Sequence, residues 1–376
     1  MVFVIALIFA FRIFGFMAVL PVLTTAATSY QDYSLVLVGL AIGVYGLVQA
    51  CLHIPMGYLS DKFGRRRIVL LGLVLMLFGS IVAAMSSTML GLIIGRAIQG
   101  GGAIGSVLNA WCADITPERN RTKAMALIGM TIGFTFLLAI LAGPIIVNKF
   151  SLSFLFWLNA VFALIAMVLT MLLPESATSI AENFKSHIKL VLCNRNLQKL
   201  DFGIFAVHAS YTALFLLIPN WINAYVGIEH SWQVYLPLLS SALLLSLPAL
   251  FLAEAKSKLK QVLIVTAAAL LLAHVVLIWH GFSWLLGLYL YFSAFTILEA
   301  LLPSLLSKHA PMGHKGTAMG VFSCSQYLGI FAGGAIGGWL LHSTSPVYVI
   351  YFGLVISLLW LFMAVGIPVI ANNHRV

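Results

Sequence analysis

The chain has 376 residues, of which 62% are hydrophobic and only 8% are charged. A typical soluble globular protein has about 25% charged residues, so this composition excludes a water-soluble enzyme, whose surface needs more polar side chains. It also excludes a disordered chain, because so much apolar surface does not stay solvated. The sequence therefore predicts that a lipid bilayer surrounds most of the chain.

Apolar segments recur along the whole chain and are long enough to cross a membrane. The hydrocarbon core of a bilayer is about 30 Å thick, which an α-helix of about 20 residues spans. A window of that length predicts twelve spans, at residues 2–27, 34–56, 68–86, 89–112, 122–148, 153–173, 201–225, 232–254, 261–279, 283–306, 316–341 and 346–371.

The basic residues between these spans are distributed unequally. Seventeen of the 20 lysines and arginines lie in the loops that follow even-numbered spans and in the C-terminal tail, whereas the opposite loops carry only Lys149. Because loops rich in lysine and arginine stay in the cytoplasm, we expect both termini to be cytoplasmic. The net charge of +10 is then an orientation signal, and no nucleic-acid partner is predicted.

One long polar stretch divides the twelve spans into two groups of six. Within it Phe184, Ile188 and Val191 recur at helical spacing while the lysines lie elsewhere, which is typical of a basic amphipathic helix on a membrane surface. A flexible linker is the alternative. We predict an all-α membrane protein with an N-terminal six-helix bundle at 1–173, a cytoplasmic amphipathic linker at 174–200 and a C-terminal six-helix bundle at 201–376.

The loop after the second span carries a distinctive run, GYLSDKFGRRR, from Gly57 to Arg67. It resembles the G-x-L-[SA]-D-[RK]-x-G-R-[RK] loop of the major facilitator superfamily of transporters. The alternative, a merely solvated basic loop, explains the arginines but not the acid or the glycines. The resemblance implies pseudo-symmetric bundles and a conformational latch, formed by Gly57, Asp61, Gly64, Arg65, Arg66 and, at the end of span 4, Asp114.

Span 4 carries a second run, from Arg96 to Ala103, that resembles the R-x-x-Q-G-x-G-A motif of the same superfamily. Gln99 and Asn109 fall on the same helical stripe as Arg96, which we expect to face protein or a substrate cavity rather than lipid. The resemblance implies a role for Arg96 in proton transfer. The alternative is an arginine that neighbouring carbonyl groups satisfy.

Span 5 contains Gly143 and Pro144, which resemble part of the glycine motif of drug:proton antiporters in this superfamily. Val147 and Asn148 stand where its last two glycines belong. The similarity extends over nearly the whole chain to bacterial inner-membrane transporters that carry a small soluble domain after span 12. We expect a bacterial inner-membrane protein of this type, without that domain after its last predicted span.

Few ionisable residues lie inside the predicted spans. Glu299 shares a helix face with Phe292 and Phe295, and an acid at membrane depth is functional by default; pairing with Lys308 or with a backbone amide is the alternative. We predict proton coupling by a group of four residues and a substrate cavity that includes the aromatic face. The coupling group is Glu299, Arg96, Arg12 and His208, and the cavity residues are Gln99, Asn109, Tyr211, Phe292, Phe295 and Gln326.

Together these features predict a monomeric secondary transporter that works by alternating access. We expect proton-coupled efflux of a small amphipathic or drug-like compound, driven by the proton gradient and needing no metal or other cofactor. A proton symporter that imports a nutrient is the main alternative. A membrane-embedded enzyme lacks support, because the chain has no HExxH or GxSxG run and no paired intramembrane aspartates. A non-transporting sensor stays open.

Overall fold

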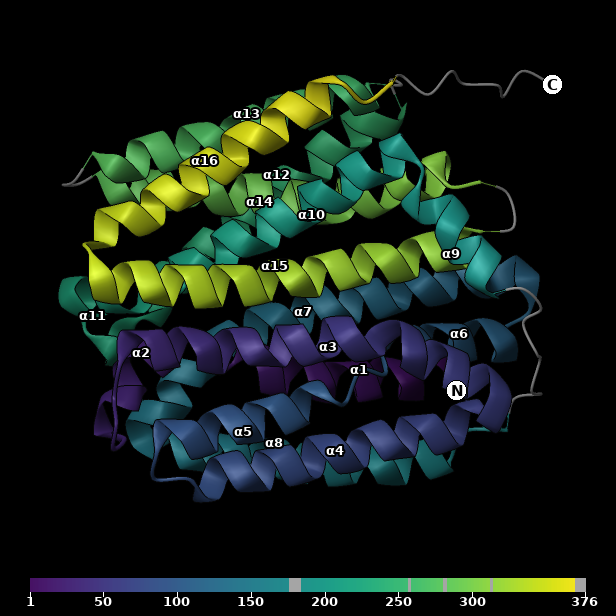
Figure 1. Cartoon of the computed structure of the whole chain (residues 1–376), viewed down its shortest axis with the longest axis horizontal. Coiled ribbons are helices and arrows are strands. Elements are labelled where there is room, and N and C mark those ends of the chain that lie inside the picture. The colour runs from purple at the N-terminus through teal and green to yellow at the C-terminus, as the bar shows by residue number, and fades with distance from the viewer. Residues whose placement is uncertain (176–183, 256–257, 280–282, 312–313, 369–376) are drawn as a thin grey trace. The chain divides into compact units, whose positions relative to one another are not determined.

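The computed structural model describes residues 1–175, 184–255, 258–279, 283–311 and 314–368. These residues are almost entirely helical and contain no β-strand, only one isolated bridge between Gln31 and Thr88. They divide into two compact units, which are described separately (Figure 1). The prediction of an all-α membrane protein is confirmed, whereas the exact limits of the two predicted bundles stay a prediction.

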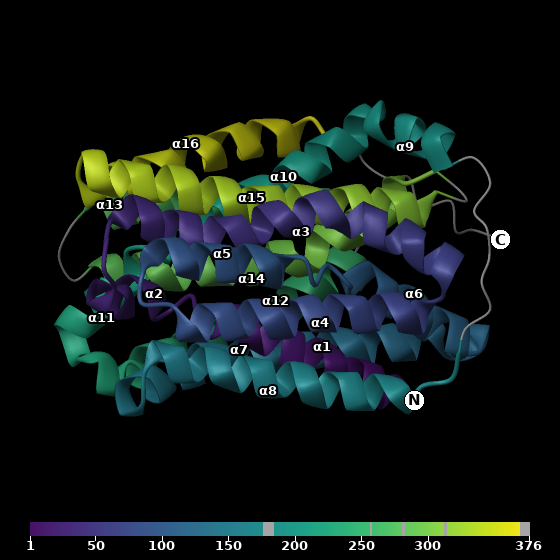
Figure 2. The same cartoon turned by 60° about the horizontal axis from the view of Figure 1, so that its bottom comes forward.

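The first unit comprises Met1–Glu182 together with Phe215–Gln233. In it α1 packs against α7 and α8, and α4 lies side by side with α5 and α8 (Figures 1 and 2). Its helices are α1 (Val2–Met17), α2 (Leu23–Ala26), η1 (Ala27–Ser29), α3 (Leu35–Phe63), α4 (Arg65–Met85), α5 (Met89–Gly100), α6 (Gly105–Ile115), η2 (Glu118–Asn120), α7 (Arg121–Lys149), α8 (Leu152–Met171), α11 (Ile218–Val226) and η3 (Ile228–His230).

The second unit comprises Asn183–Leu214 and Val234–Val376. Its central helix is α10, which packs against α14, α15 and α16, while α13 packs against α14 and α16. Its helices are α9 (Phe184–Leu192), α10 (Arg195–Leu214), α12 (Trp232–Ala255), α13 (Leu259–Ile278), α14 (Ser283–His309), α15 (Lys315–Ser343) and α16 (Pro346–Val365). The α9 helix covers residues 184–192 of the predicted amphipathic linker at 174–200, and α10 begins within that linker, at Arg195.

Most of these helices are long and apolar enough to cross a membrane. Ten pass that test among the described residues, and the bent pair α10 and α11 makes an eleventh. The first predicted span contains α1, an apolar helix of 16 residues, followed by a turn and the short α2. Each predicted span therefore coincides with a helix or with a broken helix.

Span 4 is broken, although its hydropathy predicts a continuous helix. The α5 helix ends at Gly100 and α6 begins at Gly105, with Gly101 and Gly102 between them. Consecutive glycines weaken a helix because they lose the most conformational freedom on folding. Unwound backbone at membrane depth persists only where protein satisfies its polar groups, and here the Gly102 carbonyl accepts hydrogen bonds from Arg12 Nε at 3.1 Å and Gln49 Nε2 at 3.4 Å.

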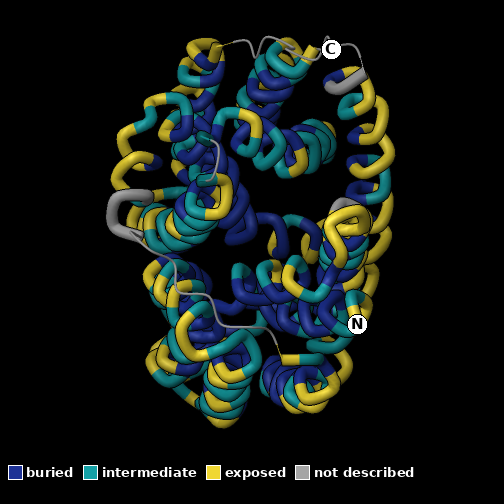
Figure 3. The backbone as a smooth tube through the Cα atoms, turned by 90° about the vertical axis from the view of Figure 1, so that its right-hand side faces the viewer, coloured by how far each residue is buried: buried dark blue, intermediate teal, exposed yellow. Residues whose placement is uncertain are grey.

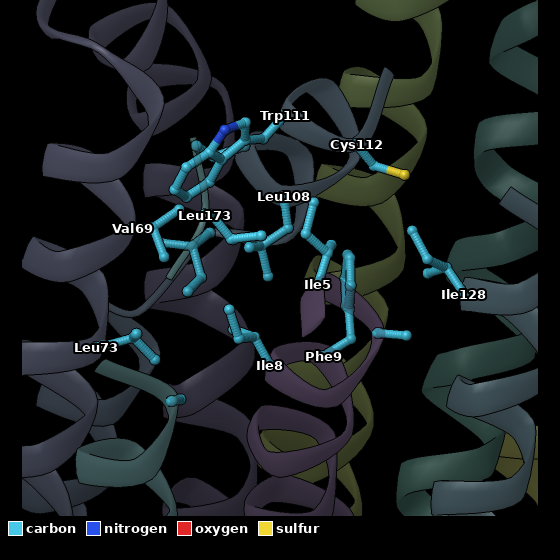
Figure 4. Close-up of a cluster of buried hydrophobic side chains, with 14 of the residues drawn as sticks. Ile5, Ile8, Phe9, Val69, Leu73, Leu108, Trp111, Cys112, Ile128 and Leu173 are labelled. Carbon is cyan, nitrogen blue, oxygen red and sulfur yellow. The ribbon is translucent and has the colours of Figure 1, made fainter. Parts of the chain in front are cut away.

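A buried apolar cluster holds the first half of α1 and the start of α4 against α6 in the first unit. Ile5, Ile8 and Phe9 of α1 meet Leu108 and Trp111 of α6 there (Figure 4). Inside a bilayer such a cluster is stabilised by van der Waals packing rather than by the hydrophobic effect, because lipid tails are as apolar as these side chains. The cluster fixes α1 beside α6, and so places Arg12 next to the break in span 4.

The helices differ in how much of their surface is buried (Figure 3). Most expose apolar side chains along one side, as helices that meet lipid do. In α10, by contrast, every residue from Ala206 to Leu214 is buried. The polar groups of this part of α10 therefore lie in a wholly protein environment.

Gly143 marks the closest approach of α7 to the turn after α1. A Cβ atom at this position would lie 2.3 Å from the Ala18 carbonyl oxygen, whereas a Cβ at Gly133 of the same helix would meet nothing within 4 Å. The partial glycine motif thus has a packing role at Gly143.

We predict that Gly143→Ala lowers the stability of the first unit by about 1–3 kcal/mol, the usual range for overpacking. Gly133→Ala is the matched control and is expected to be neutral or to stabilise by up to about 1 kcal/mol, because alanine favours helix. The thermal unfolding midpoints of the two purified variants in detergent test this. Equal midpoints would contradict the packing role.

Candidate functional site

Glu299, Gln326 and His208 form one polar network inside the second unit. They come from α14, α15 and α10, which are far apart in the sequence. Gln326 Nε2 lies 3.1 Å from Glu299 Oε1 and 2.9 Å from His208 Nε2. His208 Nε2 also lies 3.6 Å from Glu299 Oε2. The structure thus joins an acid, a base and an amide that the sequence analysis assigned to two separate groups.

The hydrogen-bond pattern fixes one consistent set of proton positions. His208 Nδ1 lies 3.2 Å from the Ile204 carbonyl oxygen, which only accepts, so Nδ1 carries the hydrogen and donates it. Nε2 of a neutral imidazole is then an acceptor. The Gln326 amide nitrogen has two hydrogens and donates one to His208 Nε2 and the other to the Glu299 carboxylate. This arrangement requires neutral His208, whereas Oε1 of Glu299 accepts the second hydrogen whether it belongs to a carboxylate or is the carbonyl oxygen of a carboxyl group.

The three members of this network differ in accessibility. The His208 side chain is 5% exposed and that of Glu299 is 40% exposed. Gln326 is half-buried between them. Glu299 is therefore the member whose side chain is partly exposed, although its Oε2 is itself buried.

Aromatic rings extend the site away from the network. The Phe295 ring lies 5.6 Å from the His208 ring and stacks on Tyr211 at 4.6 Å, between centroids. Phe292 meets Tyr211 edge to face at 6.3 Å. All three aromatic residues are buried, and such pairs contribute about 0.5–1.5 kcal/mol beyond their apolar burial. The predicted aromatic face of α14 thus continues onto α10.

Close packing of α10 against α15 brings His208 within reach of Gln326. A Cβ at Gly333 would lie 2.2 Å from the Ala209 carbonyl oxygen, and one at Gly329 would lie 2.4 Å from that of Phe205. Small residues permit this backbone approach between membrane helices. The glycines of α15 therefore position the network without taking part in it.

The first unit holds a different polar chain, built around two arginines. Arg12 Nη2 donates to Gln49 Oε1 at 2.9 Å, and Gln49 Nε2 donates to the Tyr45 hydroxyl at 3.2 Å. The Arg96 guanidinium lies over the Tyr45 ring, 4.7 Å from its centroid. Arg12 and Arg96 are thus linked through Gln49 and Tyr45 of α3.

Arg96 is fully buried and uses carbonyl, amide and aromatic partners. It donates to the Ala41 carbonyl at 3.2 Å and to Gln99 Oε1 at 3.0 Å, and Gln99 Nε2 donates onward to Ser80 Oγ at 2.8 Å. Its Nη2 has no hydrogen-bond partner among the described residues. Cation–π contact with Phe16, at 5.5 Å, and with Tyr45 offsets part of the cost of burying this charge.

The predicted latch residues meet at the junction of α3 and α4. Gly64 has φ of 92° and ends α3, so Asp61 and Arg65 belong to two helices and pair across the turn. Arg65 forms an ion pair with Asp61, donates from Nε to Asp114 Oδ2 at 3.0 Å, and also contacts Ser60 Oγ at 2.6 Å. One guanidinium therefore binds the ends of α3 and α6 to the start of α4.

Arg66 makes a separate contact with the end of the sixth span. It donates to the Leu173 carbonyl and lies 3.2 Å from Glu175 Oε1. The buried Trp111 donates from its indole nitrogen to the Pro174 carbonyl at 3.0 Å. The chain that leaves the first unit is therefore held at Leu173–Glu175 by residues of α4 and α6.

Other predicted residues lie outside these networks. The Gly57 carbonyl accepts from Ser60 Oγ at 2.6 Å, Gly143 packs as described above, and Pro144 lies inside α7. Asn109 is exposed, whereas Arg96 and Gln99 are buried. The break at residues 101–104 changes the phase of the helix, so the polar stripe of α5 does not continue along α6.

Gln49 and Asp201 are not among the residues that the motifs single out. Gln49 connects Arg12 to Tyr45, and its only sequence signal is an amide inside an apolar span. Asp201 is buried near the start of α10, and its signal is an acid at the edge of a predicted span. Among the described residues, no three His, Cys, Asp or Glu side chains lie close enough to hold a metal ion.

We predict that Gln326→Leu destabilises the second unit by about 1–3 kcal/mol, because His208 Nε2 and Glu299 Oε1 each lose a donor. Gln198→Leu is the matched control, since the Gln198 side chain is exposed and donates only to the Leu192 carbonyl. Thermal unfolding in detergent measures both variants. A Gln326→Leu protein as stable as the control would show that the amide does not hold the network together.

We also predict that Arg65→Lys costs about 1–2 kcal/mol, because an ammonium group cannot reproduce the forked contacts of a guanidinium. Arg67→Lys is the control, as Arg67 is exposed and two residues away. Unfolding midpoints at low and high salt are the measurement. Identical losses in the two variants would contradict the specific role of Arg65.

Comparison with known proteins places this geometry in context. The family model described as Major Facilitator Superfamily matches residues 3–333. The inner membrane transport protein YajR of Escherichia coli K12 is 40% identical over 368 residues, covering 95% of this chain and 81% of that protein. An uncharacterized transporter of Buchnera aphidicola subsp. Baizongia pistaciae is 34% identical over 366 residues, covering 94% of this chain and 93% of that protein.

A solved structure supports the architecture. The inward open conformation of the xylose transporter XylE from E. coli matches with a TM-score of 0.77 and 18% identity, over 99% of this chain and 98% of that one. At this level of identity the similarity concerns the fold alone.

Proposed function

Because the chain belongs to the major facilitator superfamily, a family of transporters and not of enzymes, we propose that it exports a small amphipathic compound in exchange for protons. The observation that carries this proposal is the network of Glu299, Gln326 and His208. A partly exposed acid and a buried base that share one amide form a unit whose hydrogen bonds depend on where a proton is.

The network has two proton states with different hydrogen bonds. With Glu299 ionised, the Gln326 amide donates to the carboxylate. When Glu299 takes a proton, its carboxyl group becomes a donor, and His208 Nε2, at 3.6 Å from Oε2, is an acceptor within a small movement. Protonation therefore rearranges the contacts between α10, α14 and α15.

The aromatic rings beside Glu299 favour an amphipathic substrate. Phe295 and Tyr211 are buried beside Glu299 in the conformation described, and we propose that alternating access uncovers their rings for the substrate. A ligand that stacks on these rings and contacts Glu299 competes with a proton for the same group. Such competition is what exchange transport requires, because substrate and proton then occupy the site in turn.

The two arginines of the first unit are assigned a supporting part in coupling. Arg96 keeps a full positive charge away from water and has one unused pair of donors at Nη2. Arg12 holds the unwound carbonyl of Gly102. We assign them the task of keeping span 4 in a defined conformation while the charge state of the transporter changes.

The latch around Arg65 is assigned to the cytoplasmic side of the membrane. Its contacts with Asp61 and Asp114 stabilise one arrangement of the first unit, and weakening them shifts the population toward another. The one-sided distribution of basic residues supports cytoplasmic termini in a bacterial inner membrane. We propose that the transporter acts there as a monomer and uses the proton gradient as its energy source.

The proposal is tested with purified protein in proteoliposomes. A thermal-shift screen of compound classes first identifies binders, and transport of those binders is then measured with and without an imposed pH gradient. Counterflow of substrate against protons is expected, whereas movement in the same direction would establish import by symport. Transport that ignores the gradient would refute proton coupling.

We predict that Glu299→Gln lowers gradient-driven transport roughly 10-fold or more, within the usual range of coupling free energies. Equilibrium exchange of substrate is expected to continue, because the amide keeps the shape of the acid but binds no proton. Glu229→Gln, in the exposed η3 turn, is the matched control and should behave as the native protein does. Full coupling in Glu299→Gln would remove this residue from the mechanism.

A further inference from the structure

Asp201 is a second acid buried in the second unit. It lies on α10, seven residues before His208, so that two helical turns, about 10 Å, separate two residues of one face. Asp201 is 8% exposed and His208 is 4% exposed. The linker with its basic residues joins α10 at the Asp201 end.

Among the described residues, one oxygen of this carboxylate has no structural contact that accounts for it. Asp201 Oδ1 is buried and has no hydrogen-bond partner among the described residues. The nearby Lys199 donates instead to the Gly366 carbonyl at 2.5 Å. Capping of α10 falls to Asn194, whose Oδ1 accepts from the backbone of Asn196 and Leu197 at 3.0 and 3.3 Å. A buried polar group without such a role needs another explanation.

The charged groups on the surrounding helices do not neutralise Asp201 either. Among the side chains that the structure describes, no charged group forms an ion pair with Asp201. The α16 helix has no acidic or basic residue between Pro346 and Val365. On α10 itself and on the other helices packed against it, the acidic, basic and histidine side chains that the structure describes are Arg195, Lys199 and His208 of α10, Lys189 of α9, Glu299, Lys308 and His309 of α14, and Lys315 and His342 of α15.

We propose that Asp201 is a second proton-binding carboxyl group, which passes protons between His208 and the end of α10 that joins the linker. The inference rests on the proposed function, because it extends the proton path of Glu299. The combination that carries it is burial, an unpartnered oxygen and a place on the His208 face of α10. A buried acid with these properties, at the end of a membrane-spanning helix that leads to His208, is best explained as a proton carrier.

The transfer conserves protons and needs only water as a carrier. The Glu299 carboxyl group loses its proton to His208 Nε2, which breaks an O–H bond and forms an N–H bond. The imidazolium then gives this proton to water, and the Asp201 carboxylate takes it up. Asp201 finally releases it to the solution at the linker end of α10.

The experiment follows protonation of the carboxyl groups directly, without a transported substrate. Infrared difference spectra are recorded on the full chain in lipid vesicles while the pH is lowered. We expect carbonyl bands from Asp201 and Glu299 as these carboxyl groups gain protons. Labelling all aspartates with ¹³C should shift the band of Asp201 and leave that of Glu299 in place.

Variants then assign the bands and measure the relay. Asp201→Asn should remove the aspartate band, and Glu299→Gln the other, while Asp32→Asn, in an exposed turn, should remove neither. After a rapid pH jump, Asp201→Asn should slow protonation of Glu299 roughly 10-fold or more, since a positioned acid–base group typically contributes 10²–10⁴-fold. Asp201→Glu keeps a carboxyl group and should restore most of that rate.

Each outcome decides between the two proposals. An aspartate label that shifts no buried band overturns the inference about Asp201, even if Asp201→Asn does not fold, because the labelled native chain answers the question. An unchanged rate in Asp201→Asn overturns the relay. A Glu299 band that never responds to pH would instead overturn the proposed proton coupling, whatever Asp201 does.

Discussion

The structure depends on one constraint, namely that a bilayer core offers no hydrogen-bond partners to the chain. Helices meet this constraint by pairing their own backbone groups. Where the backbone unwinds, at Gly101 and Gly102, side chains must replace the missing partners. Arg12 and Gln49 do so by donating to the Gly102 carbonyl. The few polar side chains inside the spans are thus tied to specific backbone sites, and their scarcity follows from the same constraint.

The two units meet this constraint with different chemistry. In the first, guanidinium groups that stay charged at any cellular pH contact carbonyls, amides and aromatic rings. In the second, the central groups are a carboxyl group and an imidazole, each of which has a site for a proton. The polar interior of the first unit is therefore centred on two cations, and that of the second on groups that can bind a proton. This difference suits a transporter in which one unit provides a stable frame and the other binds the coupling ion.

The features that depend on short stretches of sequence are the ones that could be predicted. Hydropathy located the spans, and the run from Gly57 to Arg67 indicated which residues gather around Arg65. A hydropathy window averages over the glycine break in span 4 and therefore does not reveal it. The break changes the phase of the helix, which is why Asn109 is exposed while Gln99 is buried. The meeting of His208 with Gln326 depends on how α10 packs against α15, and no periodicity within either helix encodes it. Asp201 carries no motif, and its lack of partners is visible only in three dimensions.

The burial of α10 on all sides has a consequence for how the protein is made. A helix whose residues from Ala206 to Leu214 all face protein gains nothing from lipid, and its polar groups oppose insertion as an isolated segment. Its principal partners, α15 and α16, are synthesised last. We therefore expect α10 to reach its final place only after the C-terminal helices have entered the membrane. The α10 helix is then fixed in place after helices of the second unit that are translated later than it is.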